Sequence, residues 1–239
     1  MIPANEVAVI SPTYCEAENI GSLIQTIEDL NINSTLLVID DSSPDETQNI
    51  VEKLKEKYGN LLLLKRPRKM GLGTAIRDGF ELLMSKPNPP KYIVTMDADY
   101  SHNPRDIPRL LDQAKKGYDL VIGSRYCEGG TVKGWTMLRR ITSMIANRLA
   151  GSIIHLSLND FTSGFRCYSK RCIQQVLPKL HSQTYEIQIE TIRQAKLQNL
   201  KVGETPITFV NRKKGRSKLS KAEIMAFSGY IIKVLLKQK

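Results

Sequence analysis

The sequence predicts an α/β fold in which a mostly parallel sheet is covered by helices. The first half of the chain alternates short apolar runs with segments of helical periodicity. These runs are apolar throughout, which is typical of parallel strands that are buried on both faces. With 239 residues the chain has the length of one domain, and we expect a single domain over residues 1–239.

The expected elements of the first half follow one another regularly. Apolar runs predict strands at 7–10, 36–39, 61–64, 92–96 and 120–123. Helical spacing of apolar residues predicts helices at about 20–30, 44–58, 72–85 and 107–116. Asn19 precedes the first of these helices and is interpreted as its N-cap.

The second half is less regular. Amphipathic helices are expected at about 135–154, where Gly151 would allow a break, and at 185–198, followed by one strand at 202–210. The basic segment at about 211–219 contains no acidic residue, and its small residues Gly215 and Ser217 favour a mobile lid. A capping box at 220–223 predicts a final amphipathic helix at about 220–237.

The chain is strongly basic. Its 35 lysines and arginines against 24 acidic residues give a net charge of +11, which favours partners that carry phosphate: nucleotides, anionic lipid or nucleic acid. A nucleic-acid-binding module is disfavoured, because aromatic residues make up only 6% of the chain and no pattern of an RNA- or DNA-binding fold occurs. We therefore expect no nucleic-acid partner.

Cysteine usage and hydropathy indicate the compartment. The four cysteines show no C-x-x-C spacing, so we expect reduced thiols in a cytosolic chain rather than a zinc or redox site. The N-terminus has no basic segment followed by an apolar stretch, and no run of about 18 uncharged apolar residues occurs. We expect neither a signal peptide nor a spanning helix, so any membrane contact would be peripheral.

Polar residues follow four of the expected strands, at 12–16, 40–42, 97–99 and 124–126. Ligands of parallel α/β sheets bind beyond the carboxyl ends of the strands. Because these four ends meet at one edge of the sheet, we expect their carboxylates, an aromatic ring and an arginine to form a single site.

The strongest single feature is the acidic pair Asp97 and Asp99. Two carboxylates two residues apart, on a chain that leaves a strand, can both turn toward a hard divalent cation such as Mg²⁺ or Mn²⁺. Acidic residues are also common in turns, so the pair alone leaves a structural role open. The polar ends of the neighbouring strands favour the metal site, and we expect Asp99 to be exposed and to contribute little to packing.

Motifs of three other enzyme classes are missing. A dinucleotide-binding protein of this architecture would carry G-x-G-x-x-G directly after the first strand. Here Gly21 is the first glycine of the chain, and Gly71-Leu72-Gly73 comes later, with Ile76 at the third glycine position. Neither a P-loop nor the nucleophile elbow of a serine hydrolase occurs.

Seven short motifs resemble, in order, the family 2 glycosyltransferases of the GT-A fold, which is Rossmann-like. The motifs shared across that family lie at 12–20, 38–45, 71–75 and 96–104. Those at 121–126, 162–166 and 215–219 look like the dolichol-phosphate mannosyltransferase branch, which uses polyprenyl-phosphate acceptors. Together the motifs cover nearly the whole chain.

The resemblance implies roles for particular residues. The nucleoside of the donor would contact Pro12, Tyr14, Glu16, Ile39 and Asp41. The metal and the diphosphate would be held by Asp97, Ala98 and Asp99. Ser101 stands where some relatives carry a glutamine as an additional metal ligand, so water could complete the coordination. The acceptor phosphate would be received by Arg125, Arg139 and Ser143, with Arg125 also near the donor, and Arg212 and Lys218 would close over the donor.

The resemblance also implies the substrates. GDP-mannose would be the donor and dolichyl or another polyprenyl phosphate the acceptor, with UDP-glucose as the alternative donor because the two branches share the strand-end motifs. The helix at 135–154 and the C-terminal helix would lie at the cytoplasmic face of a membrane, with a small membrane-anchoring subunit as a candidate partner. A phosphate acceptor is already a nucleophile, so we expect one in-line displacement with inversion and no general base.

Overall fold

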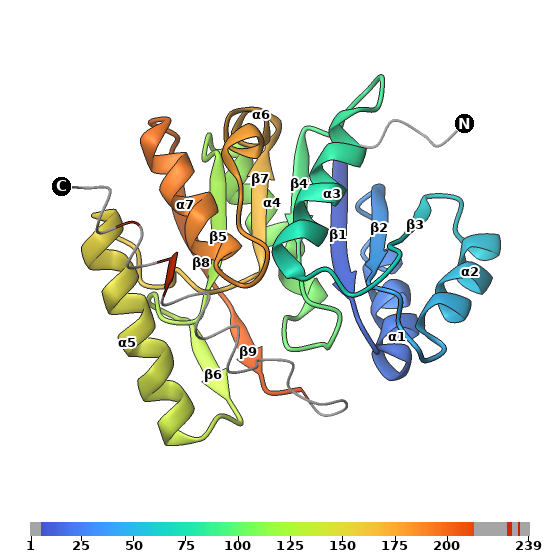
Figure 1. Ribbon diagram of the computed structural model, residues 1–239, viewed down its shortest axis with the longest axis horizontal. Helices are drawn as coiled ribbons and strands as arrows, with labels where there is room; N and C mark the ends of the chain where they lie inside the picture. Colours follow the sequence, from blue (N-terminus) through green and yellow to red (C-terminus); the bar gives the residue numbers. More distant parts are fainter. Residues whose placement is uncertain (1–5, 213–228, 231–233, 235–239) are drawn as a thin grey trace.

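The computed structural model describes residues 6–212, 229, 230 and 234, which form an α/β structure around one large sheet (Figure 1). The strands are β1 (Val7–Thr13), β2 (Ser34–Asp40), β3 (Leu61–Lys65), β4 (Tyr92–Thr95), β5 (Leu120–Ser124), β6 (Thr131–Lys133), β7 (Arg166–Ser169), β8 (Val202–Pro206) and β9 (Thr208–Val210). The α-helices are α1 (Ala17–Glu28), α2 (Thr47–Lys57), α3 (Leu72–Met84), α4 (Ile107–Lys115), α5 (Met137–Ile154), α6 (Lys170–Val176) and α7 (Ile187–Leu197).

The central sheet has the strand order β3-β2-β1-β4-β7-β5-β8. Its strands pair in parallel except β7, which lies antiparallel between β4 and β5. The mostly parallel sheet predicted from the sequence is therefore confirmed. Strand β7 was not among the expected strands, because its four residues begin with an arginine and form no apolar run.

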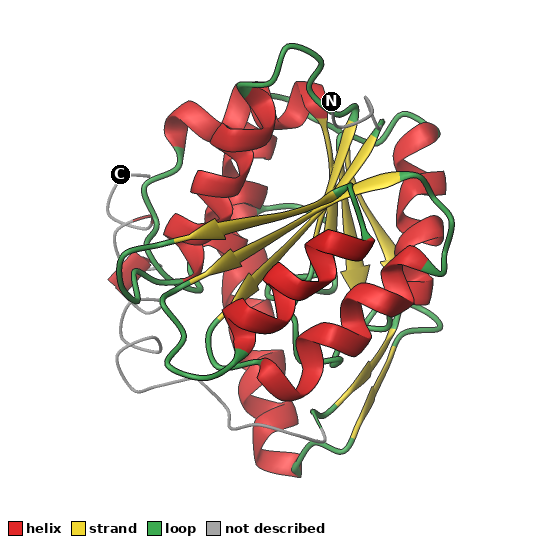
Figure 2. Cartoon of the chain, turned by 90° about the vertical axis from the view of Figure 1, so that its right-hand side faces the viewer, coloured by secondary structure: helices red, strands yellow, loops and turns green. Residues whose placement is uncertain are grey.

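The two faces of the sheet pack against different helices. Ala8 and Ile10 of β1 belong to a core with α3, α5, α6 and α7, whereas Val7 and Val9 belong to a core with α1, α2 and α4. Successive side chains of a strand point to opposite faces, so one apolar run supplies both cores. Figure 2 shows the twisted strands with helices on either side. The loops at the carboxyl ends of the strands carry the polar motifs.

The single strand expected at 202–210 is wrong, because the structure divides it into β8 and β9. Proline cannot donate to a sheet ladder, and the pairing of β5 with β8 ends where Ser124 lies opposite Pro206. Ile207 then donates to the carbonyl of Ser124 at 2.9 Å and accepts from the N–H of Thr131 at 3.0 Å. The chain thereby passes into a small second sheet, in which β9 pairs with β6.

Two expectations about helices are also corrected. Helix α1 begins at Ala17 with Glu16 in the N-cap position, so Asn19 lies inside the helix and its amide donates to the Glu16 carboxylate at 2.8 Å. Helix α5 runs unbroken through Gly151. A Cβ at Gly151 would lie 3.2 Å from the ring of Phe161, so this glycine provides room for packing rather than a break.

Two glycines at the start of α3 allow a close contact between backbones. Gly71 has a φ of 98°, and a Cβ there would lie 2.5 Å from the carbonyl oxygen of Gln183. A Cβ at Gly73 would lie 2.5 Å from the carbonyl oxygen of Ser182. A side chain at either position would push α3 away from the loop before α7. This contact explains the G-x-G spacing without a dinucleotide site.

Much of the predicted C-terminal region lies outside the described residues. This applies to the basic lid from residue 213 onward, including Lys218, and to most of the helix expected at 220–237. Gly229, Tyr230 and Val234 are helical, and Val234 is buried in the core that contains α3, α5, α6 and α7.

Candidate active site

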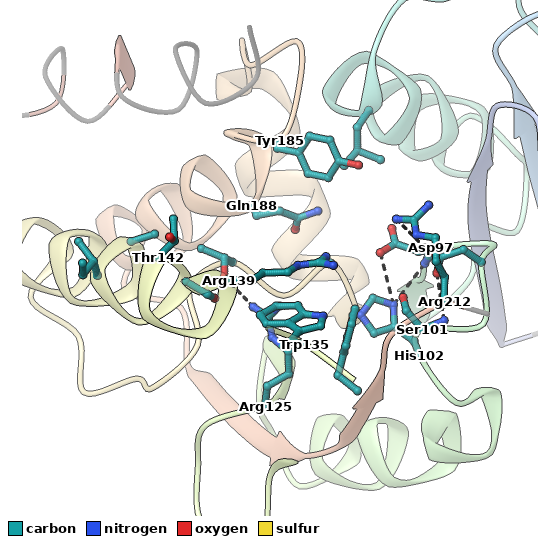
Figure 3. Close-up of a pocket in the computed structure, with 18 of the residues that line it drawn as sticks. Asp97, Ser101, His102, Arg125, Trp135, Arg139, Thr142, Tyr185, Gln188 and Arg212 are labelled. Atoms are coloured by element: carbon teal, nitrogen blue, oxygen red, sulfur yellow. Dashed lines mark hydrogen bonds and ion pairs between the residues drawn. The ribbon is translucent and has the colours of Figure 1, made fainter. Parts of the chain in front are cut away.

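The polar strand ends border a cavity of about 580 Å³ (Figure 3). Its walls come from the loops after β4 and β5, the loop before β7, helices α5 and α7, and the segment after β9. Seven residues of the predicted site line it: Asp97, Asp99, Ser101, Arg125, Arg139, Ser143 and Arg212. The fold thus brings together an acidic pair and three arginines from distant parts of the sequence.

Asp99 is buried, with 5% of its surface exposed, so the expectation of an exposed side chain is wrong. Its Oδ1 accepts from the N–H of Ser101 at 3.0 Å, and its Oδ2 pairs with Arg212 at 2.9 Å. The end of β9 covers this turn, since the N–H of Val210 donates to the carbonyl of Ser101 at 3.1 Å. Asp99 therefore joins the turn after β4 to the segment after β9.

The two carboxylates have opposite pKa shifts. Although 38% of the Asp97 side chain is accessible from the cavity, burial of the carboxyl group and the charge of Asp99 raise the pKa of Asp97 to about 7. Burial acts on Asp99 as well, but hydrogen bonds from Ser101 and the charge of Arg212 outweigh it and lower the pKa of Asp99. Near pH 7 Asp99 is charged, while Asp97 is protonated in about half of the molecules, and a cation can displace that proton.

Oxygen ligands for a divalent cation are present at this end of the cavity. Beside the two carboxylates lies Ser101, which is 2% exposed and lines the cavity. Its hydroxyl oxygen is a suitable further ligand for a hard cation. No group of three or more His, Cys, Asp or Glu suited to a metal occurs in the described part of the chain, so substrate or water oxygens would complete the coordination.

His102 lies beside the acidic pair as a neutral ring. Its Nδ1 is 3.6 Å from Oδ2 of Asp97, but burial lowers the pKa of His102 to about 4, so no ion pair forms near pH 7. Nδ1 accepts from the N–H of Asp97 at 3.4 Å, and the ring stacks on Phe165 with the centroids 5.2 Å apart. The function of His102 here is to support the turn that carries Asp97.

Arg125 is held by a buried carboxylate. Its Nε and Nη2 each donate to an oxygen of Asp160 at 2.7 Å, and Nη2 also donates to Thr162 at 2.6 Å. Burial favours a higher pKa for Asp160, but the charge of Arg125 outweighs it and holds this pKa below the usual range. The charge of Arg125 is therefore largely matched within the protein itself.

Arg139 differs from Arg125 in its contacts. Its guanidinium lies over the ring of Trp135, 4.2 Å from the centroid, and donates to the side-chain oxygen of Asn211 at 3.1 Å. Among the described residues no carboxylate lies within ion-pair distance of it, whereas Arg125 and Arg212 are both paired. Burial, with the charges of Arg212 and Arg125, lowers the pKa of Arg139. An anion in the cavity would relieve this repulsion.

Helix α5 gives the cavity a wall that is largely apolar. Ser143 lies on it, and its hydroxyl accepts from the phenol of Tyr126 at 2.8 Å. Leu138, Ile145 and Leu149 line the cavity and are also 75%, 51% and 49% exposed. The apolar wall therefore continues onto the protein surface, where three more residues of α5 are exposed: Met137, Ile141 and Met144.

The residues predicted to contact the nucleoside do not line this cavity. They are Pro12, Tyr14, Glu16, Ile39 and Asp41, and Ala98 is also absent from the walls. Strand pairing places Pro12 opposite Ile39, so the ends of β1 and β2 do bring part of this set together. Ile39 is fully buried, so neither its side chain nor its backbone is exposed at this edge of the sheet.

The polar members of this set have partners at the same edge of the sheet. Asp41 accepts from the N–H groups of Met70 and Gly71 at 3.1 Å and pairs with Arg66. The ring of Tyr14 lies under Nζ of Lys69, 4.5 Å from the centroid. They form a second polar region at the ends of β1 and β2.

Sequence reasoning did not find three side chains that shape the site. Trp135 and Gln188 line the cavity, and Asp160 lies behind Arg125. A signal existed for Asp160, which precedes the motif at 162–166 by two residues, and for Trp135, the only tryptophan of the chain. Gln188 sits in a helix whose buried face is partly polar, which no periodicity argument singles out.

Residues 8–177, most of the chain, match the model of glycosyl transferase family 2. The chain belongs to this family. The matched region runs from β1 to the end of α6 and includes the acidic pair, Arg125, Arg139 and Ser143. The resemblance found in the sequence motifs is therefore confirmed at the level of the family.

Two relatives of this family 2 glycosyltransferase have informative names. Polyprenol monophosphomannose synthase of Mycolicibacterium smegmatis is 35% identical over 224 residues, which are 93% of this chain and 84% of the relative. Dolichol-phosphate mannosyltransferase of Pyrococcus furiosus is 34% identical over 235 residues, which are 96% of this chain and 64% of that relative. The chain thus spans somewhat less than two thirds of the second relative.

Solved structures confirm the GT-A fold of this glycosyltransferase. Glucosyl-3-phosphoglycerate synthase from Mycobacterium tuberculosis, in complex with Mn²⁺, UDP and glucosyl-3-phosphoglycerate, has a TM-score of 0.70 over 97% of this chain and 78% of its own. Its sequence is 18% identical, so the likeness concerns the fold alone. Within the described residues, no helix has the length and apolar character needed to cross a membrane.

Proposed function

We propose that the chain transfers mannose from GDP-mannose to dolichyl or another polyprenyl phosphate. The names of the two relatives at 34% and 35% identity support a mannosyl transfer to a polyprenyl phosphate. The continuous sheet with its two cores supports a single catalytic domain over residues 1–239. UDP-glucose is the alternative donor.

One observation carries the proposal: a single cavity joins an acidic pair, an arginine that has no carboxylate partner among the described residues, and an apolar wall that reaches the surface. Asp97 and Asp99 suit the metal and diphosphate of a nucleotide sugar. Arg139 suits the phosphate of the acceptor, and the exposed apolar residues of α5 suit a lipid chain. An acceptor that is both anionic and apolar matches all three features.

The chemistry follows from the acceptor. A phosphate is already nucleophilic near neutral pH, so this chain needs no general base, and the displacement is in line with inversion. Mg²⁺ or Mn²⁺, held by Asp97 and Asp99 with Ser101 nearby, would supply positive charge for the departing diphosphate. Arg139 and Arg125 orient an anion that the acidic pair would otherwise repel.

Arg212 connects donor binding to the metal site. Its guanidinium pairs with Oδ2 of Asp99, so positive charge already lies where a cation is expected. A cation bound by Asp99 would displace Arg212, whose charge is then available to the diphosphate. In this proposal Lys218, outside the described residues, assists Arg212 from the basic segment.

The proposed location is the cytoplasmic face of a membrane, with peripheral attachment. The exposed apolar residues of α5 support this, because a helix with such a face favours a membrane interface. A small membrane-anchoring subunit is a candidate partner at the same surface.

An assay with labelled donors tests the function. The purified chain is incubated with Mn²⁺ or Mg²⁺, a polyprenyl phosphate and either GDP-mannose or UDP-glucose, and the lipid phase is analysed by mass spectrometry. We expect a mannosyl-phosphoryl-polyprenol, and NMR of the purified product should show the β configuration. Formation of the glucosyl product alone would establish the alternative donor, and transfer only to a soluble sugar hydroxyl would overturn the lipid-phosphate assignment.

A further inference from the structure

Gln188 lines the cavity with a buried side-chain amide. It is 4% exposed, and its Oε1 has no hydrogen-bond partner among the described residues. Figure 3 shows it between Tyr185 and Arg139, on the wall that faces Asp97. Leaving a buried amide oxygen unsatisfied costs free energy, and such groups normally bind a partner or a ligand.

Gly164 leaves a small space beside this amide. A Cβ at Gly164 would lie 3.3 Å from Nε2 of Gln188 and 3.6 Å from Oδ1 of Asp97. The carboxamide, the glycine and the carboxylate therefore border the same part of the cavity. The methyl group of an alanine at position 164 would fill part of this space, at an ordinary contact distance from the carboxylate of Asp97.

One buried guanidinium fixes both sides of this space. Nη1 of Arg166 donates to the backbone carbonyl of Gln188 at 2.6 Å, and its Nε donates to the carbonyl of Ser163, next to Gly164, at 2.7 Å. From the other side, the hydroxyl of Thr95 donates to the carbonyl of Gly164 at 2.9 Å. Arg166 is fully buried, so the distance between Gln188 and Gly164 is set by a rigid network.

We propose that Gln188 binds a hydroxyl group of the donor's hexose, and that Gly164 leaves the room for this sugar. The inference rests on the proposed nucleotide-sugar donor. A hydroxyl both donates and accepts, so it can pair with the oxygen or the nitrogen of a carboxamide. The hexose is attached to the diphosphate, and the space lies next to Asp97, where that diphosphate is expected. Gln188 therefore helps to select the sugar, whereas the acidic pair binds the diphosphate.

Binding measurements separate the sugar from the diphosphate. We compare Gln188→Met with wild type by titration with GDP-mannose and with GDP, both in the presence of Mn²⁺. Loss of one neutral hydrogen bond should weaken GDP-mannose binding by about two- to tenfold and leave GDP binding unchanged. Gly164→Ala should show the same selectivity, because its methyl group occupies the space of the sugar. Gln194→Met, on the same helix and outside the cavity wall, is the matched control.

Deoxy analogues identify the hydroxyl. Removing the bound hydroxyl from the donor should weaken binding to wild type, and Gln188→Met should cause no further loss with that analogue.

Equal losses for GDP and GDP-mannose, or no loss for either variant, would overturn the inference. If Gly164→Ala does not fold, as judged by its melting curve, Gln188→Met and the analogues still decide the matter. A wild-type chain that binds GDP-mannose selectively but does not use polyprenyl phosphate would overturn only the proposed acceptor.

Discussion

At the scale of single residues, the site depends on how two neighbouring carboxylates differ. Asp97 and Asp99 are two positions apart, yet burial and its acidic neighbour raise the pKa of Asp97, while Ser101 and Arg212 lower that of Asp99. If both carboxylates were unprotonated and no cation were bound, their negative charges would repel each other. The proton on Asp97 removes that repulsion until a metal arrives.

Metal affinity should consequently depend on pH. The pKa of Asp97 is raised to about 7, so below this pH a cation must displace a proton, and its affinity falls. We expect Mn²⁺ binding, followed by titration calorimetry, to strengthen by up to about tenfold per pH unit below pH 7 and to level off above it. His102 does not contribute, because its pKa of about 4 lies below this range. An unchanged slope in Asp97→Asn would assign the effect to another group.

The charge of Asp99 should be essential for metal-dependent binding. In Asp99→Asn the side chain can still accept from the N–H of Ser101, but it no longer attracts a cation or Arg212. We expect transfer and Mn²⁺-dependent binding of GDP to be abolished. Because the ion pair between Asp99 and Arg212 is lost, the free energy of unfolding should also fall, by about 1–3 kcal/mol in denaturant titrations.

The matched control for this change is Asp112→Asn, on the exposed side of α4. It should retain full activity and stability. Normal turnover by Asp99→Asn would contradict the assignment of Asp99 as a metal ligand.

At the scale of elements, α5 connects the cavity with the surface. Ile141 and Met144 are 47% and 45% exposed and do not line the cavity. Replacing both by asparagine should weaken sedimentation with vesicles that contain polyprenyl phosphate, since an interfacial helix binds through its apolar face. Binding of GDP-mannose in solution should not change.

The control for vesicle binding is Leu197→Asn at the end of α7, which is 55% exposed and also lies outside the cavity wall. If this change reduced sedimentation as much as the changes in α5, the effect would reflect general hydrophobicity rather than a specific interface.

Elements with a clear periodicity could be predicted from the sequence, and the others could not. The strands β1 to β5 are apolar runs and were found with small shifts at their ends. β6 has three residues, which is too short for any pattern, and β9 was expected only as part of a longer strand at 202–210. β7 contains Arg166, whose buried guanidinium is satisfied by the carbonyls of Phe161, Ser163 and Gln188. Those partners come from segments that local sequence cannot place together.

The same limit applies to the site. Residues at strand ends, such as Asp97 and Arg125, could be predicted because the topology of a parallel sheet determines where strand ends lie. Asp160 and Gln188 could not, since their importance comes from the loop before β7 and from α7, whose positions depend on long-range packing. The burial of Asp99 was missed for the same reason, because the covering segment after β9 is distant in sequence.

At the scale of the whole molecule, the chain has a net charge of +11, yet most of the charged side chains that line the cavity are paired with an opposite charge. In the cavity, Asp160 matches Arg125 and Asp99 matches Arg212, so Arg139 is the lining arginine of the described region without a carboxylate partner. A polyprenyl phosphate that approaches along the apolar wall of α5 would meet this arginine. Arg139 is therefore the residue whose replacement distinguishes the two kinds of acceptor. A lipid phosphate needs a cation to bind its charge, whereas a sugar hydroxyl does not.

Replacing Arg139 tests this distinction. Charged hydrogen bonds contribute roughly 1.5–3 kcal/mol, so Arg139→Ala should lower kcat/KM for polyprenyl phosphate by about one to two orders of magnitude. Hydrolysis of GDP-mannose by water does not need an anchor for the acceptor and should change far less. Arg140→Ala is the matched control: Arg140 donates to the carbonyl of Val132 at 2.7 Å and does not line the cavity. Normal use of polyprenyl phosphate by Arg139→Ala would contradict the assignment of Arg139 as the group that binds the acceptor phosphate.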